Sequence, residues 1–208
     1  PVNLCMMEKL DLTLDNLLDD GYNMTESEWF SVFFQVAFGL ATAQKYFNFV
    51  HNDLHSSNVM FKATELKNLF FQVGNSYYKV PTYGKITKII DFARGTFKLG
   101  DRWIFSDQFK ENGDAWGQYD YPSDGTLTNC EHKPNPSFDL CRLAVSLMDG
   151  MFDTIPPKKK GKEVSVMSQE GSWKVYETKS PLYNLLWSWM VDDKGRTIYE
   201  DEEGNEKY

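Results

Sequence analysis

The chain has 208 residues, of which 41% are hydrophobic and 15% aromatic, so it can bury one substantial core and has the size of one domain. Its formal net charge of -8 argues against nonspecific nucleic-acid binding, because such binding relies on many Lys and Arg that neutralise phosphates. The cysteines Cys5, Cys130 and Cys141 are scattered without a C-x-x-C spacing, so neither a disulfide framework nor a zinc site is predicted.

No apolar run approaches the roughly 20 residues that span a bilayer, and no signal segment opens the chain. We therefore expect neither a membrane nor a nucleic acid among the partners, and an intracellular, cytoplasmic location. The chain begins at Pro1, without a Met, on an apolar stretch. This start predicts that it is part of a larger natural product.

The first elements are predicted from hydrophobic spacing and capping residues. Residues 2–8 are an apolar run that predicts a strand, and leucines at helical spacing follow in residues 10–18. Thr25 and Glu28 have the capping-box form, in which a hydroxyl and a carboxylate satisfy exposed N–H groups at a helix start. They precede a long helix, predicted over residues 29–47, that is apolar on most faces and therefore largely buried.

The middle of the chain is rich in strand-forming residues. Strands are predicted at residues 49–51, 59–61, 69–73, 77–80 and 86–90. Turn residues at 74–75 and 81–84 separate the last three, which predicts a small antiparallel sheet.

The second half alternates between irregular and helical patterns. Residues 94–136 are rich in Gly, Asp, Asn and Pro and predict a long ordered loop. Helices are predicted at 138–148 and near 182–191, and the lysine cluster at 158–162 predicts a solvated loop between them. The predicted fold class is α+β, mainly helical, with a small antiparallel hairpin sheet.

Two polar motifs carry the chemistry. Residues 51–58 (HNDLHSSN) have the pattern H-x-D-L-x-x-x-N, and residues 89–93 (IIDFA) place a carboxylate after an apolar pair. The first resembles the catalytic loop of protein kinases and the second their metal-binding D-F-G segment. Either motif alone is weak, but together, in this order and after a long buried helix, they indicate a kinase-like fold. The alternative interpretation is a polar turn plus a buried Asp.

The resemblance implies phosphoryl transfer, which needs positioning and charge neutralisation rather than covalent chemistry by the protein. Asp53 would accept or orient the acceptor hydroxyl. Asn58 and Asp91 would supply oxygen ligands to Mg²⁺, a hard cation that also keeps phosphate oxygens and waters. The expected cofactors are ATP and Mg²⁺.

Three more residues are assigned by their place in the kinase-like pattern. His55 stands where many serine/threonine kinases have Lys, and it either hydrogen-bonds a phosphate or the acceptor, or packs against the loop. His51 is expected to support the backbone around Asp91 rather than to act as a base. Asp139 resembles the Asp that begins the central helix of kinase C-lobes and accepts backbone N–H groups of the catalytic loop. An ordinary carboxylate at a helix start is the alternative for Asp139.

The start of the chain resembles the kinase hinge. Met7 would be the gatekeeper, and the backbone of Glu8 and Leu10 would face the adenine edge. Met60 would form the apolar floor under the base. All of these residues also fit an ordinary core role.

The narrower resemblance is to divergent haspin-like protein kinases and to kinase-like proteins of large DNA viruses. It rests on Asp-Leu-His in place of Asp-Leu-Lys and on residues 77–95 (YYKVPTYGKITKIIDFARG). A viral protein would act in the host cytoplasm or the virion. Asn52 in place of Arg, Ala93 in place of Gly, a long stretch between the two motifs and the lack of A-P-E depart from the usual pattern, which leaves activation and peptide docking open.

The resemblance makes residues 1–208 a partial kinase domain, with the hinge at 1–10 and the C-lobe at 11–208. No glycine-rich phosphate loop, V-A-I-K-type Lys or partner Glu precedes the hinge. The N-lobe is thus expected in cis outside these residues, as is the extreme C-terminus, and the fragment alone is expected to be inactive.

Three functions follow from the motifs. The first is phosphorylation of Ser/Thr in a protein substrate by the complete protein, favoured by Asp139 and the hinge-like start. The second is a small-molecule kinase, because D-L-H-x-x-N followed by I-D-F also resembles aminoglycoside and choline kinases. The third is a non-catalytic pseudokinase scaffold, which the retention of Asp53, Asn58 and Asp91 makes less attractive.

Overall fold

The structure is a computed structural model that describes residues 6–19, 24–118, 121, 133–153, 155–168 and 171–191. The helices are α1 Leu14–Asp19, α2 Glu26–Phe47, α3 Phe138–Met151 and α4 Pro181–Trp189. The strands are β1 Leu12–Thr13, β2 Val59–Ala63, β3 Asn68–Val73, β4 Ser76–Pro81, β5 Lys85–Ile89, β6 Phe97–Leu99, β7 Arg102–Ile104, β8 Lys158–Ser168 and β9 Gly171–Thr178. Strands occupy about as many described residues as helices, so the mixed α+β class is confirmed but the emphasis on helix is not.

Helix α2 begins with the predicted capping box. The Glu28 N–H donates to Thr25 Oγ1 over 3.3 Å, and the Thr25 N–H donates to Glu28 Oε2 over 2.9 Å. The bond from the Thr25 N–H holds the pKa of Glu28 below its usual value. The buried part of α2 is shorter than predicted. Its last buried residue is Leu40, and Tyr46 and Phe47 near the end of the helix are exposed.

Removing the cap should destabilise the protein modestly. We expect Thr25→Ala to lower the free energy of unfolding by about 1 kcal/mol, because the Glu28 N–H at the helix start loses its acceptor, the Thr25 hydroxyl. Urea unfolding measures the change. Thr42→Ala, at an exposed position inside the same helix, is the matched control, and equal stability of the two variants would contradict this role of Thr25.

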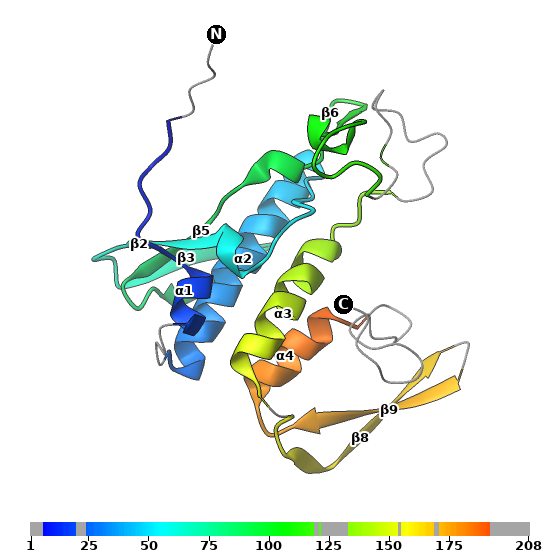
Figure 1. Cartoon of the computed structure of the whole chain (residues 1–208). Helices are drawn as coiled ribbons and strands as arrows, with labels where there is room; N and C mark the ends of the chain where they lie inside the picture. The colour runs from blue at the N-terminus through cyan, green and yellow to red at the C-terminus, as the bar shows by residue number, and fades with distance from the viewer. Residues whose placement is uncertain are drawn as a thin grey trace.

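A three-stranded antiparallel sheet in the order β1-β2-β5 lies against α2 (Figure 1). Val59 pairs with Ile89 and Phe61 with Thr87. The Thr87 N–H donates to Gln35 Oε1 of α2 over 2.9 Å, and Val59 and Phe61 are buried. The sheet thus has one face fixed on the helix, and its alternate residues face away.

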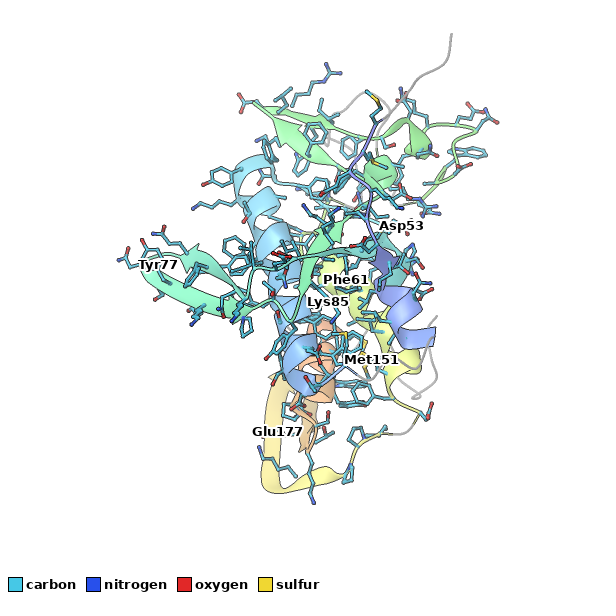
Figure 2. The ribbon with its side chains drawn as sticks, turned by 90° about the vertical axis from the view of Figure 1, so that its left-hand side faces the viewer. Asp53, Phe61, Tyr77, Lys85, Met151 and Glu177 are labelled. Carbon is cyan, nitrogen blue, oxygen red and sulfur yellow. The ribbon has the colours of Figure 1, made fainter. Side chains whose placement is uncertain are left out.

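Strands β3 and β4 form a separate hairpin, not an extension of the sheet of β5 as predicted. Gly74, with φ of +59°, makes its two-residue turn, where glycine has no steric cost. Phe71 packs against Phe34 and Phe38 of α2, with ring centroids 5.2 and 4.7 Å apart. Figure 2 shows the hairpin, marked by Tyr77, on the opposite side of the view from Asp53.

Helices α3 and α4 complete the core beside α2 (Figure 1). Trp189 of α4 meets Phe33 of α2 edge to face, with ring centroids 5.5 Å apart. The fully buried side chains of this cluster include Leu14, Phe33, Phe61, Leu143, Leu147 and Leu186. The core therefore joins the sheet, both long helices and α4 around one apolar centre.

Several sequence-based predictions need correction. Residues 6–8 form no strand, and residues 2–5 lie outside the described part. Only Val50 of the predicted strand 49–51 pairs, in an isolated bridge with Thr96. The predicted loop 94–136 contains the β6–β7 ladder, although residues 119–120 and 122–132 lie outside the described part. The lysine cluster lies in β8 rather than in a loop: Lys158 pairs with Thr178 of β9, and the register is irregular between Lys158 and Glu163.

None of the helices in the described residues is both long enough and apolar enough to cross a membrane.

Candidate active site

The loop of residues 51–58 is held at both ends by backbone pairing. Val50 and Thr96 exchange two N–H bonds of 2.9 Å just before the loop, and Asn58 leads directly into β2. The Asn58 carbonyl accepts the Ile90 N–H over 3.0 Å. This bond sets the end of the loop beside the segment that carries Asp91.

Asp139 anchors the start of the same loop from helix α3. Its Oδ2 accepts the His51 N–H over 2.8 Å, and its Oδ1 accepts the Asn52 N–H over 3.0 Å. The residue is fully buried. Burial raises the pKa of Asp139 to about 6, and the two N–H bonds act in the opposite direction. One carboxylate thus fixes two successive peptide groups next to Asp53.

His51 joins the loop to the segment of Asp91. Its Nε2 lies 2.8 Å from the Ile90 carbonyl, and its Nδ1 lies 3.3 Å from the Asp53 backbone nitrogen. These partners select the neutral ring, in which Nε2–H donates to the carbonyl and Nδ1 accepts the N–H. Burial lowers the pKa of His51, since a charged imidazole is costly in this site.

The neutral ring of His51 predicts a pH-dependent contribution to stability. Because its pKa is lower in the folded than in the unfolded state, its contribution is complete above about pH 6.5 and is lost as the pH falls. We expect His51→Gln to cost about 2 kcal/mol near neutral pH and less near pH 5. Urea unfolding at both pH values measures this. A difference that stays constant or grows toward acid pH would contradict the assignment.

Asp53 meets two arginines. Its Oδ1 lies 3.5 Å from Arg94 Nη1 and 3.6 Å from Arg142 Nη2. Its side chain is 20% exposed, so it is mostly covered but still accessible to solvent. The sequence did not predict that either arginine lies beside Asp53, because no local pattern links them to this residue.

The other polar residues of the motifs lie around Asp53. The Asn58 amide donates to the Asp53 carbonyl over 2.9 Å and lies 3.2 Å from His55 Nε2. Asp91 has a left-handed backbone with φ of 59°, a conformation that Asp tolerates better than most residues. Its Oδ1 accepts the Ala93 N–H over 3.3 Å.

The donor set fits Mg²⁺. The amide nitrogen of Asn58 is engaged by the Asp53 carbonyl, which leaves the amide oxygen as the atom available to a cation. That oxygen and the Asp91 carboxylate are hard ligands of the kind that Mg²⁺ prefers. The described residues contain no cluster of three or more His, Cys, Asp or Glu that could hold a metal. Phosphate oxygens and waters would therefore have to complete the coordination shell.

The residues predicted to contact adenine are less closely grouped. Met7 is 80% exposed, in the stretch before β1 that runs away from the body (Figure 1). Glu8 forms ion pairs with Lys62 and Lys88, with N–O distances of 3.8 and 3.4 Å. Leu10 is half-buried, and Met60 lies opposite Lys88 in the sheet. The structure thus brings Met60 and Glu8 to one sheet face but leaves Met7 in solvent.

Asn52 connects three segments around the site. Its backbone φ is 65°, a left-handed value that Asn adopts more readily than most residues. Its side-chain nitrogen donates to the Arg94 carbonyl over 2.8 Å, and its Oδ1 accepts the Tyr121 hydroxyl over 3.2 Å. An uncharged amide therefore occupies the position where the usual kinase pattern has Arg.

Ser56 also supports the loop, and no sequence signal marked it. Its hydroxyl donates to Asp15 Oδ1 over 2.7 Å, and its N–H donates to Ser146 Oγ over 3.1 Å. Helices α1 and α3 thereby hold the loop from two sides.

Part of the chain is similar in sequence to serine/threonine protein kinases. Serine/threonine-protein kinase haspin of Bos taurus is 32% identical to it over 91 residues, 44% of this chain and 12% of the relative. The haspin of Mus musculus is 30% identical over 110 residues, 43% of this chain and 15% of the relative. A probable serine/threonine-protein kinase of Dictyostelium discoideum is 35% identical over 96 residues, 43% of this chain and 8% of the relative.

The alignments therefore span less than half of this chain and less than a sixth of each of these relatives. No protein-family model matches the chain.

Proposed function

We propose that the chain carries the acceptor-activating and Mg²⁺-binding residues of an ATP-dependent kinase that phosphorylates Ser or Thr hydroxyls of proteins. The observation that carries this proposal is the grouping of Asp53, Asn58 and Asp91. Asn58 is hydrogen-bonded to the Asp53 carbonyl, and its own carbonyl accepts the N–H of the residue before Asp91. A base and two oxygen ligands thereby lie in one small region.

In this proposal, Asp53 accepts the proton of the acceptor hydroxyl as the hydroxyl oxygen forms its bond to the γ-phosphorus. The bond from that phosphorus to the bridging oxygen breaks, and ADP leaves with the electron pair. Asn58 and Asp91 would hold Mg²⁺, which supplies charge neutralisation at the phosphates when bound. His51 and Asp139 position the loop through their hydrogen bonds.

The adenine would lie on the outer face of the sheet, where Met60 provides an apolar surface and residues 7–10 a hinge. We assign residues 1–10 to the hinge and 11–208 to the C-lobe. The glycine-rich loop and its Lys are not found in residues 1–208, so we infer that sequence outside them covers the nucleotide in cis. Dependence on ATP also favours an intracellular, cytoplasmic location, which for a viral protein would be that of the host.

A protein acceptor is favoured because the similar proteins are named as serine/threonine protein kinases. The test uses the chain expressed with the sequence that flanks it in its gene, γ-labelled ATP and Mg²⁺. Peptide arrays and aminoglycosides or choline are offered in parallel. We expect label on Ser or Thr peptides. Label only on a small molecule would support the small-molecule kinase, and nucleotide binding without any transfer would support a scaffold.

A further inference from the structure

Two guanidinium groups from different elements converge on one oxygen of Asp53. Arg94 lies in the short 3-10 turn just after Asp91, and Arg142 lies in the second turn of α3. Their N–O distances of 3.5 and 3.6 Å exceed those of good hydrogen bonds. Both guanidinium groups are therefore near the carboxylate, but it does not occupy their N–H donors. A single carboxylate group, that of Asp53, therefore lies between two guanidinium groups.

Arg142 is placed by the same helix turn that anchors the loop. It follows Asp139 by three residues, a spacing that puts both side chains on one face of α3. Asp139 is bonded to the loop backbone, so the guanidinium is directed at the site by a rigid element. Its side chain is 42% exposed, and among the described residues Asp53 is the one acidic group paired with it. Most of its five N–H donors therefore remain available to a ligand.

His55 is less suited to binding an anionic ligand, because its Nε2 lies 3.2 Å from the Asn58 side-chain nitrogen. The cations nearest to Asp53 are thus the two arginines. An anion that fits beside them must lie within a few Å of the acceptor hydroxyl. In phosphoryl transfer that anion is the phosphoryl group itself, because the attacking oxygen must approach it to about 3–3.5 Å.

We propose that Arg94 and Arg142 form an arginine clamp that neutralises the transferring phosphoryl group. The inference rests on the proposed function and adds two catalytic residues to it. As the acceptor oxygen binds the phosphorus, its proton moves to Asp53, and the bond to ADP breaks. Asp53 then loses its negative charge, so the attraction that held both guanidinium groups shifts to the phosphoryl oxygens. The clamp therefore binds the transition state more strongly than the ground state.

The test compares binding of two probes to the protein in its full natural sequence. Calorimetry gives the affinity for ADP with Mg²⁺, and then with added aluminium fluoride, which imitates the transferring phosphoryl group. The readout is the ratio of the two affinities. We expect Arg142→Gln to lower this ratio by roughly 10–100-fold, the range for loss of charge-assisted bonds. Arg102→Gln, an exposed arginine of β7, is the matched control and should keep the wild-type ratio.

An unchanged ratio in Arg142→Gln would overturn the clamp while leaving the proposed function intact. Failure of the wild-type protein to bind ADP would overturn both. A thermal melt checks that the variant is folded. If Arg142→Gln does not fold, Arg142→Lys replaces it, because Lys keeps the charge but lacks the planar fork. That variant should also lower the ratio, and a wild-type ratio would again exclude the clamp.

Discussion

Asp91→Asn is expected to lower the rate of phosphoryl transfer roughly a thousandfold, the scale of losing one electrostatic contact to the transition state. Asn has nearly the same shape, can accept the same Ala93 N–H and tolerates the left-handed backbone at φ of 59°. The substitution therefore removes the charge with little disturbance of the fold. It should also raise the Mg²⁺ concentration needed for half-maximal rate.

The measurement is the transfer rate over a Mg²⁺ titration. Asp101→Asn is the matched control, because Asp101 is an exposed carboxylate in the turn between β6 and β7. An Asp91→Asn protein with the rate and Mg²⁺ dependence of the control would show that Asp91 is not a metal ligand.

Asp139→Ala is expected to cause the largest loss of stability, about 3–4 kcal/mol. The substitution leaves the backbone N–H groups of His51 and Asn52 without their buried acceptor, and each such group costs about 1–3 kcal/mol. The transfer rate should fall as well, since the loop that carries Asp53 loses its anchor.

The effect of Asp139→Ala should depend on pH in a defined direction. The folded pKa of about 6 lies above the unfolded value near 3.9, so the folded state holds this proton more tightly. The contribution of Asp139 to stability is thus greatest below about pH 4 and falls by up to about 3 kcal/mol as the pH rises through 6. The difference between wild type and Asp139→Ala should therefore shrink over this range.

Urea unfolding at about pH 4.5 and 7 tests both statements about Asp139. Asp153→Ala, at an exposed carboxylate just after α3, is the control and should show little change at either pH. A difference that widens with rising pH would contradict the raised pKa of Asp139.

Local signals accounted for the parts of the fold that could be predicted. The capping box of Thr25 and Glu28, the turn at Gly74 and the apolar periodicity of α2 all depend on residues a few positions apart. The lysine cluster at 158–162 and residues 94–136 were assigned to loops for their polar composition. Lys158 and the residues of β6 and β7 nevertheless pair as strands, because backbone groups of a partner strand satisfy theirs.

In the site, too, the residues of local motifs could be predicted and the contacts between distant segments could not. The spacing within residues 51–58 marked Asp53 and Asn58 because the pattern H-x-D-L-x-x-x-N is a local motif. Arg142 could not be found in this way, since its contact with Asp53 depends on how α3 packs under the loop. Asn52 was noticed as a departure from the pattern, but its bonds to the Arg94 carbonyl and the Tyr121 hydroxyl required the tertiary structure.

The central claim is that Asp53 activates an acceptor hydroxyl for phosphoryl transfer. The most direct test is the Mg²⁺-dependent transfer of γ-labelled phosphate from ATP to Ser or Thr peptides, by wild type and by Asp53→Asn in the full natural sequence. The account predicts transfer by wild type and a loss of roughly 10²–10⁴-fold in the variant. Equal rates in the two proteins, or no transfer by wild type, would contradict it.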